Sequence, residues 1–214
     1  MSGALKKKVL LIGLDGATYK VIDRGIKENL LSTLYTFKEN GVWGNLHSVV
    51  PSLSPYSWPV LCTGLNAGKL GIFGLSKVVE WNSPLDFREI LPSRRDINGI
   101  PIWKILSENG IKVGIVNIPV TYPPDKVNGF MISGFLAPST SKRYFYPESI
   151  SPFLKDYVID ITFSGEEAGW IPEKGVDLNK VYKMQWEISK KRFITSCKLI
   201  MKYKPEFFLI NFKG

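Results

Sequence analysis

The chain has 214 residues, of which 44% are hydrophobic and 22% are charged, and its mean hydropathy is +0.00. These values are those of an ordinary globular protein, and they exclude a disordered chain and a collagen-like repeat. No Gly/Ser-rich, Pro-rich or charged linker separates two blocks of different composition, so we expect residues 1–214 to form a single domain.

The excess of 28 Lys and Arg over 19 Asp and Glu gives a net charge of +9, which favours anionic partners. Many of the lysines fall on one face of a helix expected over residues 177–203, and the other face carries the apolar side chains. Such a basic face is typical of a solvated helix surface, and no nucleic-acid-binding motif accompanies it. We therefore do not expect a nucleic-acid partner. The expected apolar face consists of Tyr182, Trp186, Phe193, Cys197 and Ile200.

Cysteine spacing and the distribution of apolar segments indicate a cytoplasmic protein. The two cysteines, Cys62 and Cys197, form no C-x-x-C spacing, so neither a disulfide framework nor a zinc knuckle is indicated. The apolar run after Lys8 meets Asp15 too early for a signal peptide. The uncharged stretch 40–68 is interrupted by prolines, so we expect it to be buried or to line a site rather than to span a membrane.

The predicted elements alternate between strands and helices along the chain. Compact apolar runs that end at turn residues predict strands buried on both faces, and 3.6-residue periodicity predicts helices. This alternation predicts an α/β fold with a mainly parallel central sheet flanked by helices. In chain order, we expect a strand at 9–14, helices at 18–30 and 32–40, a strand at 42–50, a helix at 54–63, a helix at 100–109, strands at 112–118, 130–133 and 158–163, a helix at 177–203 and a strand at 207–212.

Two side chains at the expected carboxyl edge of this sheet could carry chemistry, because reacting groups gather there in open parallel sheets. Asp15 directly follows the first strand, where it could bind a divalent cation or cap the next helix. Ser54 begins a helix with Pro55 at the next position. It could attack an anionic phosphoryl group there if a base or metal activates it, or it could simply cap that helix.

The single histidine excludes several mechanisms. His47 alone cannot form a two-histidine zinc site, and no G-x-S-x-G elbow is present for a Ser-His-Asp triad. We therefore expect His47 to be a structural residue on the strand at 42–50. The G-x-G-x-x-G and Walker A spacings are also absent, which argues against nucleotide binding by those loops.

Two motifs together resemble the alkaline phosphatase superfamily, in its type I phosphodiesterase and nucleotide pyrophosphatase branch. The first is VLLIGLDG at 9–16, which is similar to the opening strand of the branch with its metal-binding aspartate. The second is PSLSPYSW at 51–58, in which Ser54 lies nine residues before Thr63-Gly64, the spacing of the nucleophile in this branch. Segments between residues 95 and 134 are also similar to it.

The resemblance implies an alkaline phosphatase-like α/β domain and a metal-dependent phosphoesterase that acts through a phosphoserine intermediate. Ser54 would be the nucleophile, and Asp15 with the Ser54 oxygen would bind one of two divalent cations, expected to be zinc. Ser57 stands where some relatives hold phosphate with asparagine, and Tyr122 is expected to line the substrate pocket. The substrate would be a phosphate ester or a nucleotide-type small molecule.

The chain also departs from the pattern of this branch. Leu70 replaces a histidine of a common Lys-His-Gly-Ile string, and the remaining metal ligands of the family lie after the point where the sequence ends. We therefore expect the front portion of the domain, truncated at its C-terminal end, in which the second metal site cannot be built. The alternative is a non-catalytic α/β module or remnant that binds a partner or an anion. Truncation would also leave the strand at 207–212 with an unpaired apolar edge that favours self-association.

Overall fold

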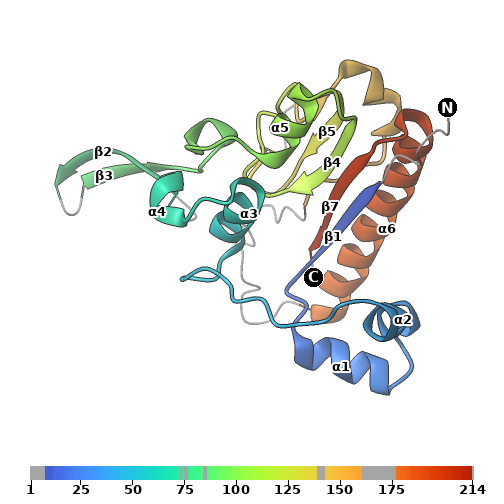
Figure 1. Cartoon of the computed structure of the whole chain (residues 1–214). Coiled ribbons are helices and arrows are strands. Elements are labelled where there is room, and N and C mark those ends of the chain that lie inside the picture. Colours follow the sequence, from blue (N-terminus) through green and yellow to red (C-terminus); the bar gives the residue numbers. More distant parts are fainter. Residues whose placement is uncertain are drawn as a thin grey trace.

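A five-stranded sheet forms the centre of the molecule (Figure 1). The structure, a computed structural model, describes residues 8–72, 74, 77–83, 86–138, 143–160 and 177–213. Four strands are parallel, and the fifth, β6, pairs antiparallel with β5. This mostly parallel sheet between helices confirms the expected α/β class. The strand order is β1 (Val9–Asp15), β7 (Phe207–Lys213), β4 (Val113–Ile118), β5 (Gly129–Ser133) and β6 (Phe145–Tyr146).

Helices and one separate hairpin complete the described part of the chain. The strands β2 (Lys77–Ser83) and β3 (Asp86–Ile90) pair antiparallel and project away from the central sheet (Figure 1). Sequence analysis did not predict this hairpin. The helical elements are α1 (Tyr19–Lys27), α2 (Ser32–Asn40), α3 (Ser54–Thr63), α4 (Ala67–Leu70), the 3₁₀ turn η1 (Arg94–Asp96), α5 (Ile102–Glu108), the 3₁₀ helix η2 (Glu148–Phe153) and α6 (Leu178–Tyr203).

The two faces of the sheet are covered by different helices. On one face, Leu209 and Ile115 pack in a cluster that contains Trp58 of α3 and Trp103 of α5. On the other face, α6 is packed against Phe208 and Ile210 of β7 and their neighbours. Every residue of β4 is buried, as expected for a strand in the middle of a covered parallel sheet. This arrangement places the start of α3 beside the end of β1.

The strand expected at 42–50 is absent from this structure. Residues 42–48 form an exposed irregular segment that pairs with none of the described strands. His47 is exposed there, so its expected role as a structural residue on a strand is wrong. Within the uncharged stretch 40–68, which we expected to be buried or to line a site, the buried residues all belong to α3 and are Pro55, Tyr56, Trp58, Pro59 and Cys62. A segment rich in β-branched residues, such as 42–50, forms a strand only where a neighbouring strand can pair with the segment.

The buried face of α6 also differs from the expected one. Tyr182 and Trp186 are both 67% exposed and Phe193 is 58% exposed. The helix instead turns Arg192 toward the sheet, where its guanidinium donates hydrogen bonds to the carbonyls of Asn211 and Ile159. An arginine can be buried when its guanidinium has carbonyl acceptors, so apolar periodicity alone does not predict this buried face. The buried face consists of Ile188, Arg192, Thr195, Ser196 and Leu199.

The edge of the sheet lies at β1 rather than at the last strand. We expected the strand at 207–212 to have an unpaired edge, but β7 pairs with β1 on one side and β4 on the other. The described residues provide β1 with a partner on one side only. Leu10 and Ile12, which share a face of the sheet with Phe208 and Ile210 of β7, are 62% and 48% exposed.

The segment expected as a strand at 158–163 is not one over residues 158–160, and residues 161–163 lie outside the described residues. Among the helices that the structure describes, none combines the length and the apolar character needed to cross a bilayer.

Candidate functional site

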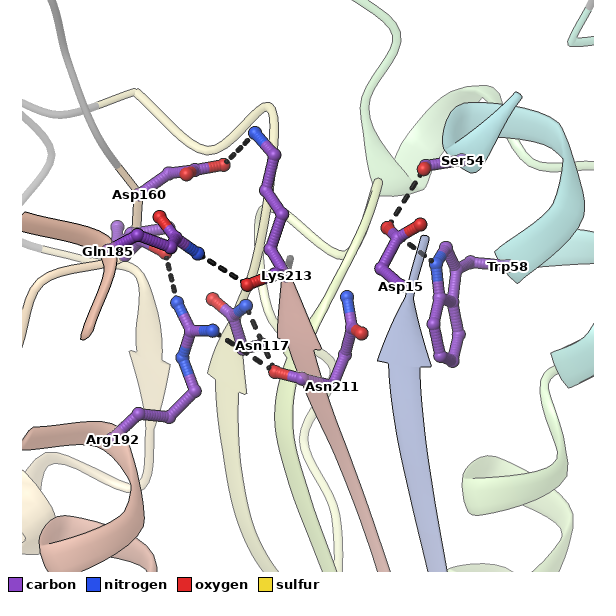
Figure 2. A network of polar contacts seen from close by, with 10 residues as sticks. Asp15, Ser54, Trp58, Asn117, Asp160, Gln185, Arg192, Asn211 and Lys213 are labelled. Carbon is purple, nitrogen blue, oxygen red and sulfur yellow. Dashed lines mark hydrogen bonds and ion pairs between the residues drawn. The ribbon is translucent and has the colours of Figure 1, made fainter. Parts of the chain in front are cut away.

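The candidate site lies where β1 ends and α3 begins. Asp15 is the last residue of β1, and Ser54 is the first residue of α3. The two are 39 positions apart in the sequence, yet they meet at the carboxyl edge of the sheet (Figure 2). Such an edge collects functional groups because strand ends and helix N-termini converge on it.

The Asp15 carboxylate receives two hydrogen bonds from α3. The Ser54 hydroxyl donates to Asp15 Oδ2 at 2.9 Å, and the Trp58 indole Nε1–H donates to the same oxygen at 3.4 Å (Figure 2). Ser54 and Trp58 are four residues apart, so they lie on one face of the helix. Trp58 is a site residue that sequence reasoning missed. Its signal in the sequence is the one-turn spacing from Ser54.

Neither Asp15 nor Ser54 serves as a simple helix cap. The N-cap of α1 is Thr18, and the N-cap of α3 is Leu53. Ser54 lies one position inside the helix, and no side-chain capping bond is formed at the start of α3. The expectation that Ser54 caps this helix is therefore wrong by one position, and its hydroxyl is instead directed at Asp15.

The electrostatic environment favours a negative charge at this point. The N-terminal end of a helix carries a partial positive charge, and the first turn of α3 contains no acidic residue of its own. Asp15 supplies a carboxylate from the neighbouring strand. The same end of the helix could stabilise the oxygens of a bound phosphoryl group.

Cys62, near the far end of α3, carries a second potential nucleophile, its thiol sulfur. Burial raises the pKa of the Cys62 thiol to about 12, so the reactive thiolate is suppressed at neutral pH. The Ser54 hydroxyl is half-buried and bonded to a carboxylate. Of these two groups, Ser54 has the environment that suits a nucleophile.

The two other predicted site residues lie on different elements of the structure. Ser57 is half-buried on α3, one turn after Ser54, and its backbone N–H donates to the Leu53 carbonyl. Tyr122 is half-buried in the connection between β4 and β5, where its carbonyl accepts a hydrogen bond from the Arg94 N–H at 2.6 Å. Their contacts with a substrate stay predictions.

A second polar network lies at the carboxyl end of β7 (Figure 2). The Asn211 carbonyl accepts a hydrogen bond from Arg192 Nη1 at 3.2 Å, and Lys213 forms an ion pair with Asp160 at 3.0 Å. The side-chain oxygen of Asn211 is buried without a hydrogen-bond partner. Asn211 pairs with Gly13 in the register between β7 and β1, so this network borders the candidate site.

The described residues provide few ligands for a metal. The Asp15 carboxylate and the Ser54 hydroxyl supply two oxygen donors, which are suitable for a divalent cation. No group of three or more His, Cys, Asp or Glu side chains that could hold a metal ion occurs in the described part of the chain. The site therefore fits one cation in part, and the described residues give no ligand set for a second.

Comparisons with known proteins identify the family and the fold of the chain. The profile of the family described as type I phosphodiesterase / nucleotide pyrophosphatase matches residues 9–214. A search of curated proteins finds no match. Two solved structures of phosphonoacetate hydrolase from Sinorhizobium meliloti 1021 are similar in fold, each with a TM-score of 0.61. One is in complex with phosphonoacetate, at 16% identity, and the other with phosphonoformate, at 17% identity.

These alignments cover 97% of this chain and 46% of each solved chain. The chain thus spans about half the length of the relatives that it matches. At this level of identity the likeness establishes the alkaline phosphatase-like fold alone, and the family match adds the phosphoesterase lineage. The chain is a member of the type I phosphodiesterase / nucleotide pyrophosphatase family.

Proposed function

We propose that this chain carries the nucleophile of a metal-dependent phosphoesterase that forms a phosphoserine intermediate on Ser54. The observation that carries the proposal is the 2.9 Å hydrogen bond from the Ser54 hydroxyl to Asp15 Oδ2 at the N-terminal end of α3. A serine hydroxyl needs an adjacent base or metal to become a good nucleophile at neutral pH. The Asp15 carboxylate can act as the base or can bind the metal.

Ser54 and Asp15 have distinct parts in the proposed reaction. Ser54 Oγ attacks phosphorus while its proton passes to Asp15 Oδ2, the acceptor of its hydrogen bond. The bond from phosphorus to the leaving oxygen breaks, and that oxygen departs with the bonding electron pair. Water then attacks the phosphoserine and gives one proton to solvent, the bond from phosphorus to Ser54 Oγ breaks, and Asp15 returns its proton to Ser54. The positive end of the α3 dipole stabilises the phosphoryl oxygens throughout.

One divalent cation, expected to be zinc, would be held by the Asp15 carboxylate and the Ser54 oxygen. The cation would neutralise the charge that develops on the reacting oxygens. The members of this superfamily generally depend on metal. A second cation would need protein groups outside the described residues, because those residues contain no further cluster of metal-binding side chains.

The proposed substrate is a phosphate ester or a nucleotide-type small molecule. The family description names phosphodiester and nucleotide pyrophosphate substrates, and the solved relatives were crystallised with small phosphonates. Ser57 lies one turn from Ser54 on the same helix and is proposed to contact the phosphoryl group. Tyr122 is proposed to contact the remainder of the substrate.

The direct test is hydrolysis of bis-p-nitrophenyl phosphate with added Zn²⁺. The assay compares the wild-type chain with Ser54→Ala, and it is repeated on any longer polypeptide that contains this sequence. Ser54→Ala should lower kcat at least about 10³-fold, because no other group can replace the nucleophile. Ser52→Ala is the matched control, since Ser52 is exposed two positions earlier and should keep full activity. Equal activity of wild type and Ser54→Ala would contradict the proposal.

The scarcity of metal ligands among the residues that the structure describes favours a second candidate, a non-catalytic module that binds an anion or a protein partner. This candidate predicts no hydrolysis by any of these polypeptides with Zn²⁺, Mn²⁺ or Mg²⁺. Binding of inorganic phosphate, measured by calorimetry, would persist and would weaken in Ser54→Ala. Metal-dependent hydrolysis that is lost in Ser54→Ala excludes the module.

A further inference from the structure

We propose that Trp58 is a positioning residue that fixes the orientation of the Asp15 carboxylate. This inference rests on the proposed function, because it assigns to Trp58 the task of presenting Asp15 to Ser54 and to a cation. The evidence is the hydrogen bond from the indole Nε1–H to Asp15 Oδ2 at 3.4 Å, together with the packing that holds the indole in place.

The Trp58 ring is fixed against β1 by a glycine. A Cβ atom built on Gly13 would lie 2.0 Å from Trp58 Cη2, well inside any allowed contact. The ring therefore occupies the space that a side chain at position 13 would fill, two residues before Asp15. Trp58 is 8% exposed and belongs to the cluster that includes Leu209 and Ile115. Close packing of this kind leaves the ring one orientation.

The two donors from α3 act on the same carboxylate oxygen. The Ser54 hydroxyl can rotate about its Cβ–Oγ bond, so its hydrogen bond alone would leave the Asp15 side chain free to turn. The indole N–H has a fixed direction within a packed ring. Among the described residues, no hydrogen bond reaches the other carboxylate oxygen, Oδ1. Trp58 thus holds Oδ2 toward α3 and leaves Oδ1 available to a cation.

A second buried indole in the same core offers a matched control. Trp103 Nε1 donates to Asp125 Oδ2 at 2.9 Å, and Trp103 is 2% exposed. Both tryptophans belong to one cluster, and each bonds a carboxylate. Asp125 is paired with Arg94 rather than with the candidate site. Trp58→Phe and Trp103→Phe therefore remove the same kind of hydrogen bond and keep an aromatic ring, but only the first touches Asp15.

The experiment has a spectroscopic part and a binding part, both performed on the whole chain. The ¹H–¹⁵N spectrum of the indole groups is recorded for wild type and Asp15→Ala, and the two variants above assign the Trp58 and Trp103 signals. Zn²⁺ affinity is then measured by calorimetry for wild type, Trp58→Phe and Trp103→Phe. Urea denaturation shows whether the two phenylalanine variants are equally stable.

Three results are expected. Asp15→Ala shifts the Trp58 indole signal and leaves the Trp103 signal in place. Added Zn²⁺ does the same to the wild-type chain. Trp58→Phe weakens Zn²⁺ binding about 10-fold or more, the usual effect of losing a group that orients a metal ligand, whereas Trp103→Phe binds Zn²⁺ as wild type does.

Other results would overturn the proposal or its foundation separately. An unchanged Trp58 signal in Asp15→Ala, or equal Zn²⁺ affinities in the two phenylalanine variants, would refute the role of Trp58. If the wild-type chain binds no Zn²⁺, the proposed cation site fails, and the indole signals alone then decide whether Trp58 holds Asp15. If Ser54→Ala retains hydrolysis, the proposed function fails while the Zn²⁺ comparison still tests Trp58.

Discussion

At the scale of single residues, Ser54 and Cys62 of α3 are potential nucleophiles in very different surroundings. Ser54 lies at the open end of the helix beside a carboxylate, and Cys62 is 4% exposed within the core. Burial in an apolar cluster stabilises the neutral thiol, because the low dielectric penalises the thiolate. The surroundings of the two residues therefore favour Ser54 over Cys62 as a nucleophile.

We predict that Cys62 is nearly inert toward thiol reagents in the folded chain. Its pKa of about 12 leaves almost no thiolate near neutral pH, and its sulfur lies inside the core. Cys197 is only half-buried and should react first. Ellman's reagent would therefore titrate one thiol quickly in native buffer and both in urea. Rapid reaction of both thiols in the native chain would contradict this burial.

The same burial predicts a loss of stability at alkaline pH. Folding raises the pKa of Cys62 from 9.0 and that of Tyr157 from 10.0, in each case to about 12. The unfolded chain releases these protons first, so the free energy of unfolding falls as pH rises from 9 toward 12. Each group contributes a slope of at most about 1.4 kcal/mol per pH unit.

Urea denaturation at a series of pH values tests this slope. Below pH 9, ionisation of Cys62 and Tyr157 should not change the free energy of unfolding. Above pH 9, the decline of this free energy with pH should be shallower in Cys62→Ala. An identical pH profile in the variant would show that the thiol is not protected in the folded state.

At the scale of elements, the contact between β1 and α3 joins the fold to the site. Gly13 provides the space for the Trp58 ring, and Trp58 reaches Asp15 from the next turn of α3 after Ser54. A methyl group at position 13 would force the ring away from the strand. The geometry of the site therefore depends on the absence of a side chain two residues before its carboxylate.

We predict that Gly13→Ala destabilises the chain by about 1–3 kcal/mol, the usual cost of overpacking a core. The Cβ would lie 2.0 Å from a ring that belongs to a core cluster. Urea denaturation measures the loss, and the Trp58 indole signal should shift at the same time. Gly44→Ala is the control, because a Cβ there meets nothing within 4 Å. A neutral Gly13→Ala would show that the ring does not pack on β1.

The sequence was sufficient for those elements whose apolar run and end signals are both local. The apolar runs that become β1, β4 and β7 were predicted to within one residue at each end, since they alternate with helices and end at turns. The segment 42–50 has similar residues, but none of the described strands pairs with it. On α6, the buried face includes Arg192, which donates hydrogen bonds to backbone carbonyls, and it therefore differs from the face that apolar periodicity predicts.

The candidate site was predictable only in part. The position of Asp15 after a strand and of Ser54 before a helix indicated that both lie at one sheet edge. Trp58 was missed because an apolar residue between prolines reads as core, and its N–H bond depends on the tertiary contact with Gly13. Ser54 is the first residue of α3 rather than its N-cap. Residue propensities do not predict a helix end to within one residue.

At the scale of the whole molecule, the sheet has an exposed apolar edge at β1. Leu10, Ile12 and Leu14 are between 44% and 62% exposed, and the strand pairs only with β7 in the described part of the chain. An apolar strand with unpaired backbone groups favours association with another chain. The choice of edge depends on strand order, which apolar pattern does not reveal.

We predict that the chain self-associates through β1 at raised concentration. Ile12→Lys should reduce the association, since a charged side chain on an edge strand opposes pairing. Val21→Lys is the control, because Val21 is 61% exposed on α1, outside the sheet. Multi-angle light scattering over a concentration series gives the mass. A monodisperse wild-type monomer at every concentration would contradict the prediction.

The central claim, that Ser54 attacks phosphorus beside Asp15, is tested most directly by trapping the intermediate. The chain, or a longer polypeptide that contains it, is mixed with bis-p-nitrophenyl phosphate and Zn²⁺, quenched in acid and digested for mass spectrometry. We expect a phosphoryl ester on the peptide that contains Ser54, and none in Ser54→Ala. Hydrolysis that proceeds with the ester on another residue, or undiminished in Ser54→Ala, would contradict it.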